Sequence, residues 1–322
     1  MKKRFLCIML ITIFTLGGCQ NSSDGFLAYE DTLNATDHSI DNRVSQGEFF
    51  AEEIAVVAQY NNVGGDEQLN SGATLLINIS ESKAEYADHV FDQLYPSSLT
   101  KLLTALVVLK YGELTDAVSV SYNAAHIKDA GARVCGYVEG DVISMEALLN
   151  SLLIYSGNDA AIAIAEHVGG SVEGFVDMMN KEAAKIGAVQ SNFMNPTGLH
   201  DKDQYTTAYD MYLVFNALLK YDTFRGIIGS SSYTVKYQNR NGDELEKVLN
   251  TINPFINSAD LLPEGITAGG GLTGSTSKAG NCCILLYKDG NNTEYIAVIM
   301  KAASGDSLQS QMSHLLSKTE AN

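Results

Sequence analysis

Residues 98 to 110 form a helix-length segment that is apolar on almost every side. Leucine or valine stands at positions 99, 102, 103, 106, 107, 108 and 109, so the segment keeps no polar stripe to face water. Such a helix has to lie inside a core, with other elements packed around it. Ser98 and Lys101 stand at its start, and burying the charge of Lys101 costs free energy that structure alone does not repay.

The composition is that of an acidic protein with ample apolar residues for a core. The 322 residues are 45% hydrophobic and carry a formal net charge of −17. Wholesale disorder is excluded. Nucleic acid is not expected as a partner, because its binding needs clustered lysine and arginine.

The cysteines are too few for a disulfide scaffold. Three of the five fall inside the expected fold, Cys135, Cys282 and Cys283, and they allow at most one intramolecular disulfide. The neighbours Cys282 and Cys283 are expected on opposite faces of one strand. The sequence leaves the state of the three thiols open.

Residues 1–18 have the pattern of a signal peptide. A basic head precedes the apolar run Phe5–Leu16, which is too short for a membrane helix. Cys19 follows two glycines, a pattern that resembles a bacterial lipobox. This predicts an extracytoplasmic lipoprotein, anchored to the cell membrane through a lipid on Cys19. The alternative is an ordinary signal peptide with an incidental cysteine. We expect a flexible tether over 19–48, one folded domain over 49–318 and a C-terminal tail over 319–322.

Strand and helix patterns divide the domain into two parts. An apolar strand is expected over 73–79 with a hairpin partner over 85–89, and further hairpins turn at Asn241-Gly242 and Asp289-Gly290. Periodicity and caps predict helices over 145–155, 158–168, 171–186, 207–220 and 307–316. The sequence therefore predicts an α+β fold. An antiparallel sheet forms from both ends of the domain, flanked by helices, and the second lobe is mostly helical.

The start of the apolar helix is a candidate nucleophile site. Ser98 and Lys101 are three residues apart, which places both side chains on one helix face. A serine hydroxyl needs a base to take its proton, and a buried lysine can be that base because desolvation lowers its pKa. The helix start also offers free backbone N–H groups to a developing oxyanion.

Two further segments stand out beside this pair. Ser156-Gly157-Asn158 lies between two apolar helices, where Asn158 could simply be a helix cap. The run 272–276, Leu-Thr-Gly-Ser-Thr, precedes an apolar strand and could be a glycine-rich loop feeding an edge strand. Positions 269–274 also fit a dinucleotide-binding glycine pattern, but a strand follows where a helix is required, so we reject that interpretation.

In this order, the segments resemble the S-x-x-K, S-x-N and K-T-G elements of serine-active penicillin-binding proteins. Over residues 49–302 the chain resembles the low-molecular-weight D-alanyl-D-alanine carboxypeptidases. It is carried by Tyr95–Lys101, Leu153–Ala161, Asn195–Leu199, Tyr205–Asp210, Thr273–Thr276 and Ala279-Gly280. The resemblance implies a β-lactamase/transpeptidase-like fold and a single serine carboxypeptidase domain.

The resemblance also implies a role for each matching residue. Ser98 would be the acyl-forming nucleophile, Lys101 its proton acceptor, and Ser156 the relay to the leaving D-alanine nitrogen. Asn158 would bind the substrate peptide and hold Lys101. Thr273 would help bind the terminal carboxylate, and Gly274 and Ser275 would also bind substrate. Backbone N–H groups of Ser98 and Ser275 would form the oxyanion hole. The substrate would be a peptidoglycan stem peptide, and β-lactams would acylate the same serine. No cofactor or metal is implied.

One position departs from the family pattern. The lysine of K-T-G falls on Leu272, which cannot supply positive potential for the substrate carboxylate. Either a basic residue from another segment replaces it, or activity is weak or lost. A non-catalytic or weakly active penicillin-binding lipoprotein is therefore the alternative function. A β-lactamase is weaker still, because the E-x-x-L-N match at 146–150 precedes Ser156 when it should follow it.

Overall fold

The main sheet is built from both ends of the domain. The computed structural model describes residues 54–57, 65–129 and 131–319. Its five-stranded sheet runs β2-β1-β9-β8-β7, and each pair of neighbours is antiparallel. The strands are β1 (Ala73–Asn78), β2 (Lys83–Asp88), β7 (Thr267–Thr276), β8 (Gly280–Lys288) and β9 (Glu294–Ala302). The predicted sheet of N-terminal and C-terminal strands is confirmed.

The predicted leader over 1–18, Cys19 and the tether over 19–48 lie outside the described residues, as do 320–322 of the tail. The described residues belong to one compact unit, Phe50–Asn322. None of its described helices is both long enough and apolar enough to span a bilayer.

Each face of the sheet has its own core. Along β8, Cys282 and Ile284 belong to the core shared with the helices, whereas Cys283 and Leu285 belong to the opposite core. This alternation follows from the two-residue period of a strand. Helix α10 (Gly305–Ser317) covers the second face with Leu308, Met312, Leu315 and Leu316. Cys282 and Cys283 therefore lie on opposite faces as predicted, and both are buried free thiols, as is Cys135.

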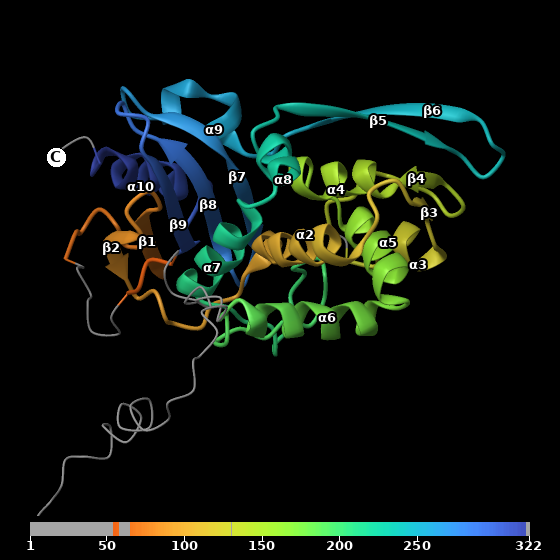
Figure 1. The fold of residues 1–322 in the computed structure, drawn as a ribbon, viewed down its shortest axis with the longest axis horizontal. Helices are drawn as coiled ribbons and strands as arrows, with labels where there is room; N and C mark the ends of the chain where they lie inside the picture. Colours follow the sequence, from red (N-terminus) through yellow and green to blue (C-terminus); the bar gives the residue numbers. More distant parts are fainter. Residues whose placement is uncertain (1–53, 58–64, 130, 320–322) are drawn as a thin grey trace, which may run out of the picture. The chain divides into compact units, whose positions relative to one another are not determined.

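Helix α2 (Thr100–Tyr111) lies at the centre of the helical lobe (Figure 1), and its buried residues include Lys101. The helices around it are α4 (Met145–Ile154), α5 (Asn158–Gly169), α6 (Val172–Lys185) and α7 (Ala208–Leu218). Side chains of Ser144 and Ser171 accept backbone N–H groups at the helix starts, so these two predicted caps form. Thr207 caps α7 in the same way. The helix predicted from Ser98 begins with a short 3₁₀ turn, η2 (Ser97–Leu99).

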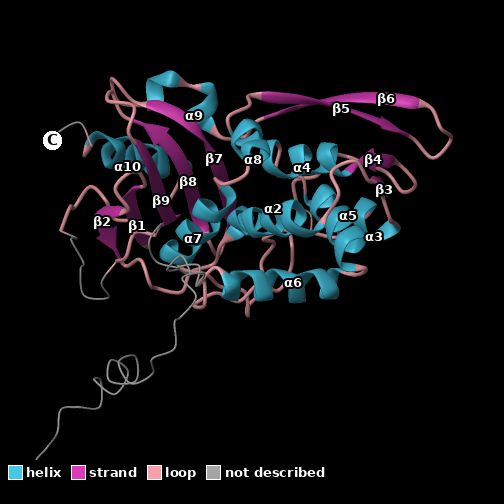
Figure 2. Ribbon diagram, viewed as in Figure 1, coloured by secondary structure: helices cyan, strands magenta, loops and turns pink. Residues whose placement is uncertain are grey.

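The helical lobe also contains a small sheet. Its order is β3-β4-β5-β6, and the predicted hairpin around Asn241-Gly242 forms its longer half (Figure 2). The strands are β3 (Ala117–Ser119), β4 (Val142–Ser144), β5 (Ser232–Gln238) and β6 (Glu244–Asn250). Three-residue strands such as β3 and β4 carry too little pattern to predict. The remaining short elements are α3 (Tyr122–Ala125), α8 (Asp222–Ile228), α9 (Pro254–Asn257) and η3 (Ala259–Leu261).

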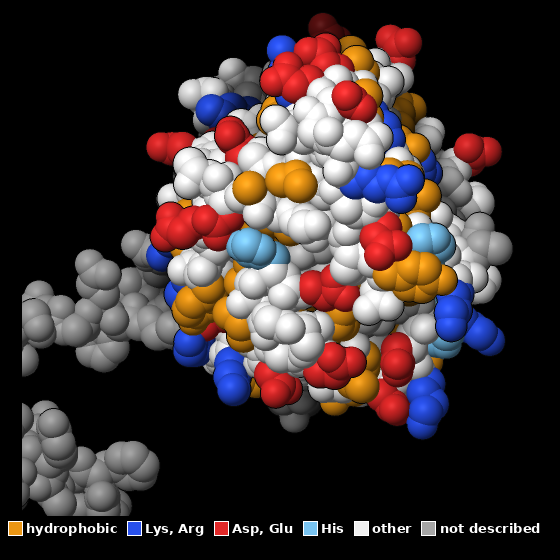
Figure 3. All heavy atoms as spheres, turned by 90° about the vertical axis from the view of Figure 1, so that its right-hand side faces the viewer, with side chains coloured by type: hydrophobic (Ala, Val, Ile, Leu, Met, Phe, Trp, Pro, Cys, Tyr) orange, Lys and Arg blue, Asp and Glu red, His pale blue; other side chains and the backbone are white. Residues whose placement is uncertain are grey.

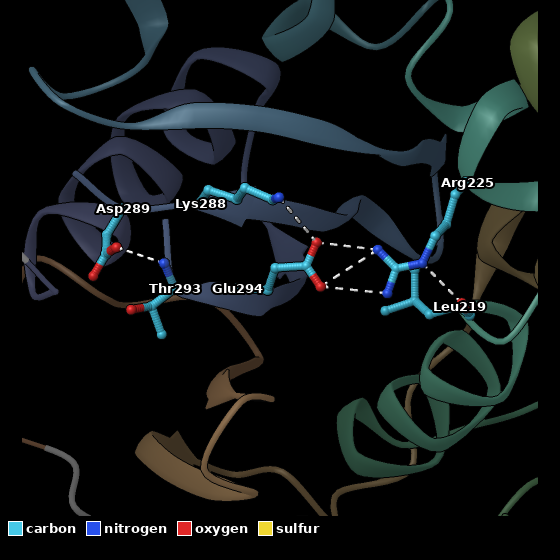
Figure 4. A network of polar contacts seen from close by, with 6 residues as sticks. All are labelled: Leu219, Arg225, Lys288, Asp289, Thr293 and Glu294. Carbon is cyan, nitrogen blue, oxygen red and sulfur yellow. Dashed lines mark hydrogen bonds and ion pairs between the residues drawn. The ribbon is translucent and has the colours of Figure 1, made fainter. Parts of the chain in front are cut away.

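An ion pair joins the helices to the main sheet. Arg225 of α8 contacts Glu294 of β9 with both terminal nitrogens, at 3.1 and 3.3 Å, and its Nε donates to the Leu219 carbonyl at 2.8 Å (Figure 4). Lys288 Nζ lies 3.6 Å from the same carboxylate. The face at the end of the helical lobe shows acidic and basic side chains interspersed, with no continuous basic patch (Figure 3).

Candidate active site

A cleft of about 590 Å³ lies between strand β7 and the loops of the helical lobe. Six residues predicted from the sequence line it: Ser98, Ser156, Asn158, Thr273, Gly274 and Ser275. Lys101 lies beneath Ser98 and has no exposed surface. The structure thus brings the predicted chemical residues of the folded domain to one place.

Ser98 lies between two polar partners. Lys101 Nζ donates to Ser98 Oγ at 3.3 Å, and Ser156 Oγ donates to the same atom at 3.0 Å. The first contact follows from the one-turn spacing on η2 and α2. The second joins residues 58 positions apart and requires the α4–α5 turn to fold over Ser98. Ser156 has φ +64 in this turn, an uncommon conformation for a residue with a side chain.

Two further oxygens hold Lys101. Its Nζ donates to Asn158 Oδ1 at 2.8 Å and to the Thr197 carbonyl at 2.5 Å. The pKa of Lys101 is lowered from 10.5 to about 7, chiefly by burial. Cys135 and Asp159 oppose this shift, and the Arg133 charge adds to it. A large share of the lysine is therefore neutral near pH 7. Asn158 and Thr197 can accept the two protons of a neutral amine, leaving its lone pair for the Ser98 hydroxyl.

The Thr197 carbonyl is a site atom that the sequence did not predict. Asn195 Oδ1 accepts the N–H groups of Thr197 and Gly198 at 3.2 and 2.8 Å, which fixes the turn. Thr104 Oγ1 of α2 donates to the Pro196 carbonyl at 2.8 Å. The only available signal was the family-like segment 195–199, because a backbone acceptor leaves no trace in residue type.

The Ser156-Gly157-Asn158 turn differs from the simple helix cap considered above. Gly157, not Asn158, occupies the cap position of α5. The Asn158 side chain is buried and points to Lys101 instead. The next residue, Asp159, accepts the N–H groups of Cys135 and Gly136 at 2.9 and 2.8 Å. Asp159 therefore ties a neighbouring loop to the site, a role the sequence did not predict.

Strand β7 forms the other wall of the cleft. The glycine-rich run lies within this edge strand, not in a loop before a strand, which corrects the alternative considered above. A Cβ on Gly274 would lie 2.5 Å from Ser97 Oγ and 2.6 Å from the Ser98 nitrogen. Only glycine allows β7 to approach the nucleophile this closely. The glycine at this position therefore sets the width of the cleft.

Leu272 stands at the position where the family has the lysine of K-T-G. Its side chain is 3% exposed and belongs to the apolar core on the helical face of the sheet. Lys278, the nearest basic residue along the chain, lies exposed in the β7–β8 turn and does not line the cleft. Strand β7 thus brings no cation to the site.

Comparison with known proteins agrees with this geometry. A peptidase S11 family model, described as D-alanyl-D-alanine carboxypeptidase, matches residues 59–304. The chain belongs to this family. It is 31% identical over 252 residues to the D-alanyl-D-alanine carboxypeptidase DacF of Bacillus subtilis, covering 76% of this chain and 60% of that protein. It is 30% identical over 262 residues to DacD of Escherichia coli, covering 77% and 63%. The chain thus matches about three fifths of the length of these relatives.

Solved structures give the same fold. The Streptomyces K15 DD-transpeptidase superimposes with a TM-score of 0.73 at 23% identity, over 78% of this chain and 97% of that chain. A D-alanyl-D-alanine carboxypeptidase from Mycobacterium tuberculosis H37Rv gives 0.69 at 23% identity, over 78% and 91%. The predicted β-lactamase/transpeptidase-like fold is confirmed.

Proposed function

We propose that this protein removes the terminal D-alanine from peptidoglycan stem peptides through an acyl-enzyme at Ser98. The observation that carries the proposal is the position of Ser98 Oγ, 3.3 Å from Lys101 Nζ and 3.0 Å from Ser156 Oγ, in a cleft edged by β7. Nucleophile, base and proton relay are thus within reach of one reacting carbonyl. Family membership supports the same reaction.

Acylation begins with proton transfer from the Ser98 hydroxyl to neutral Lys101. Ser98 Oγ then attacks the carbonyl of the penultimate D-alanine, and the negative charge on its oxygen is stabilised by backbone N–H groups of Ser98 and Ser275. As the peptide bond breaks, Ser156 Oγ gives its proton to the leaving nitrogen and takes the proton held by Lys101, which returns the amine to its neutral form. Its hydrogen bond to Ser98 Oγ places the Ser156 hydroxyl beside the reacting atoms.

Deacylation reverses the proton path with water as the nucleophile. Water attacks the ester carbonyl and gives a proton to neutral Lys101. That proton returns to Ser98 Oγ as the Ser98 Oγ–carbon bond breaks and the shortened peptide leaves. Asn158 keeps Lys101 in place through both steps. A β-lactam would follow the first half of this path and leave its acyl group on Ser98.

We also propose that the protein is held outside the cytoplasm by a lipid on Cys19. Support comes from the basic head, the apolar run Phe5–Leu16 and the small residues before Cys19. This location would place the cleft near its peptidoglycan substrate.

The weakly active alternative rests on Leu272 alone. It is not favoured, because the contacts among Ser98, Lys101, Ser156 and Asn158 are complete. A β-lactamase is disfavoured too, because the 146–150 match lies within α4, where Leu148 and Leu149 are fully buried.

Release of free D-alanine from diacetyl-L-lysyl-D-alanyl-D-alanine tests the proposed activity. Wild type is expected to release D-alanine, and Ser98→Ala should lose at least a thousandfold in kcat/KM. Equal and negligible release by both forms would favour the non-catalytic alternative.

A further inference from the structure

The cleft lacks the lysine of its family, yet it still has a basic wall. Among the described residues that line it, the basic side chains are Arg133 and His200, and neither comes from β7. Arg133 lies in the loop between α3 and β4, beside the Ser156 turn. A guanidinium is charged at every pH at which proteins fold, whereas a histidine is charged only in part near neutrality.

The loop holds Arg133 firmly beside the catalytic turn. The backbone N–H of Asn158, whose side chain holds Lys101, donates to the Arg133 carbonyl at 2.8 Å. Cys135 follows two residues after Arg133. Its N–H donates to the Asp159 carboxylate, and its carbonyl accepts from Lys247 Nζ at 2.6 Å. Contacts at its own carbonyl and at Cys135 therefore fix the backbone of Arg133.

The Arg133 side chain is exposed and available to an anion. Its guanidinium lies over the ring of Tyr155, 5.4 Å from the centroid, and Tyr155 directly precedes Ser156. No carboxylate among the described residues forms an ion pair with it. Asp129 also lines the cleft, but its carboxylate accepts the Gly131 N–H at 2.8 Å. The Arg133 charge thus lies in the cleft beside the Ser156 turn and has no counter-ion among the described residues.

We propose that Arg133 replaces the missing lysine and binds the terminal carboxylate of the stem peptide from the wall opposite β7. A guanidinium can bind a carboxylate through two parallel N–H bonds, which also fixes its orientation. Stacking on Tyr155 limits the side chain to few positions, so little conformational freedom is lost on binding. The proposal deepens the proposed function and rests on it for the identity of the ligand.

Peptide binding to a Ser98→Ala protein tests this role without turnover. Diacetyl-L-lysyl-D-alanyl-D-alanine has a single carboxylate, and its C-terminal amide has none. The dissociation constants of both are measured by ligand-detected NMR. We expect the acid to bind at least tenfold more tightly than the amide. Adding Arg133→Gln to the Ser98→Ala protein should abolish this preference by weakening the binding of the acid alone. Arg133→Lys in its place should retain part of the preference.

Two control variants separate this effect from general charge and from the second basic wall residue. Lys128 is an exposed residue of the same loop that does not line the cleft. Lys128→Gln removes one positive charge there and should leave the preference for the acid unchanged. His200→Gln should also leave it unchanged.

Any of three results would overturn the proposal. Arg133→Gln could keep the preference for the acid, or it could weaken the binding of acid and amide equally. The third is that His200→Gln alone removes the preference. A protein that prefers the acid through Arg133 but releases no D-alanine would instead contradict the proposed activity.

Discussion

At the scale of single residues, the environment of Lys101 decides whether Ser98 can react. The lysine is fully buried and meets three oxygen acceptors. Burial favours the neutral amine, and the hydrogen bonds keep that amine directed at Ser98. A charged lysine could orient the serine but could not take its proton.

The rate of Ser98 acylation is expected to follow the protonation of Lys101. Because its pKa is lowered from 10.5 to about 7, the neutral, active form dominates above pH 7. The acylation rate constant should fall about tenfold for each pH unit below 7 and level off above it. Stopped-flow measurements with a chromogenic cephalosporin between pH 5.5 and 8.5 give this profile.

His200→Gln is the control for the pH profile, because His200 also lines the cleft. The variant should keep the wild-type profile. A flat profile in wild type, or the loss of the limb in His200→Gln, would show that Lys101 is not the titrating base.

The contact between Ser98 and Lys101 could be predicted from the sequence for a local reason. It depends on one helical turn, which the three-residue spacing determines. The Thr197 carbonyl and the Arg133 side chain could not be predicted in the same way. Their approach depends on loops held by Asn195 and Asp159, contacts that exist only once distant elements have packed.

At the scale of elements, strand β7 and helix α2 define the cleft by how closely they pack. We expect Gly274→Ala to reduce the acylation rate at least a hundredfold, because the new methyl group would lie 2.6 Å from the Ser98 nitrogen and push the strand away. Intact-mass time courses with a penicillin measure the rate.

Gly290→Ala is the matched control, since a Cβ there meets nothing within 4 Å. Its acylation rate should equal that of wild type. If Gly274→Ala reacts at the wild-type rate, β7 does not need its close approach to Ser98.

Longer elements were predicted more reliably than short ones. The α4, α5, α6 and α7 helices were found from periodicity and caps, because each repeats its pattern over several turns. The strands β3 and β4 have three residues each and depend on their partners for stability. The position of Leu272 within β7 explains why leucine is tolerated there. The position is buried on the helical face of the sheet, where leucine is less costly than an unpaired lysine.

At the scale of the whole molecule, the Arg225–Glu294 pair connects the helices with the main sheet (Figure 4). Both side chains are partly exposed, at 34% and 24%, so the pair is worth about 1 kcal/mol. Glu294→Gln should therefore lower Tm by about 2–4 °C in a domain of this size. Differential scanning calorimetry measures the shift.

Glu246→Gln makes the same change in a pair with Lys236, where both side chains are more than half exposed. Its Tm should stay within about 1 °C of wild type, since exposed pairs contribute little. Equal shifts for the two variants would refute a special role for the Arg225–Glu294 contact.

Membrane attachment is also a property of the whole protein. If Cys19 carries the lipid, the full-length protein should sediment with membranes, and Cys19→Ala should appear in the soluble extracytoplasmic fraction. Immunoblots of the two fractions decide this. The lipid proposal fails if both forms distribute in the same way.

The mass of the intact protein after incubation with a penicillin tests the central claim, that Ser98 is an activated acyl-forming nucleophile. We predict that wild type gains the mass of one penicillin, that Ser98→Ala gains none, and that Ser277→Ala, changed at another cleft residue, is labelled like wild type. A wild-type protein that remains unlabelled after long incubation, or a Ser98→Ala protein that is labelled as fully as wild type, would contradict the account.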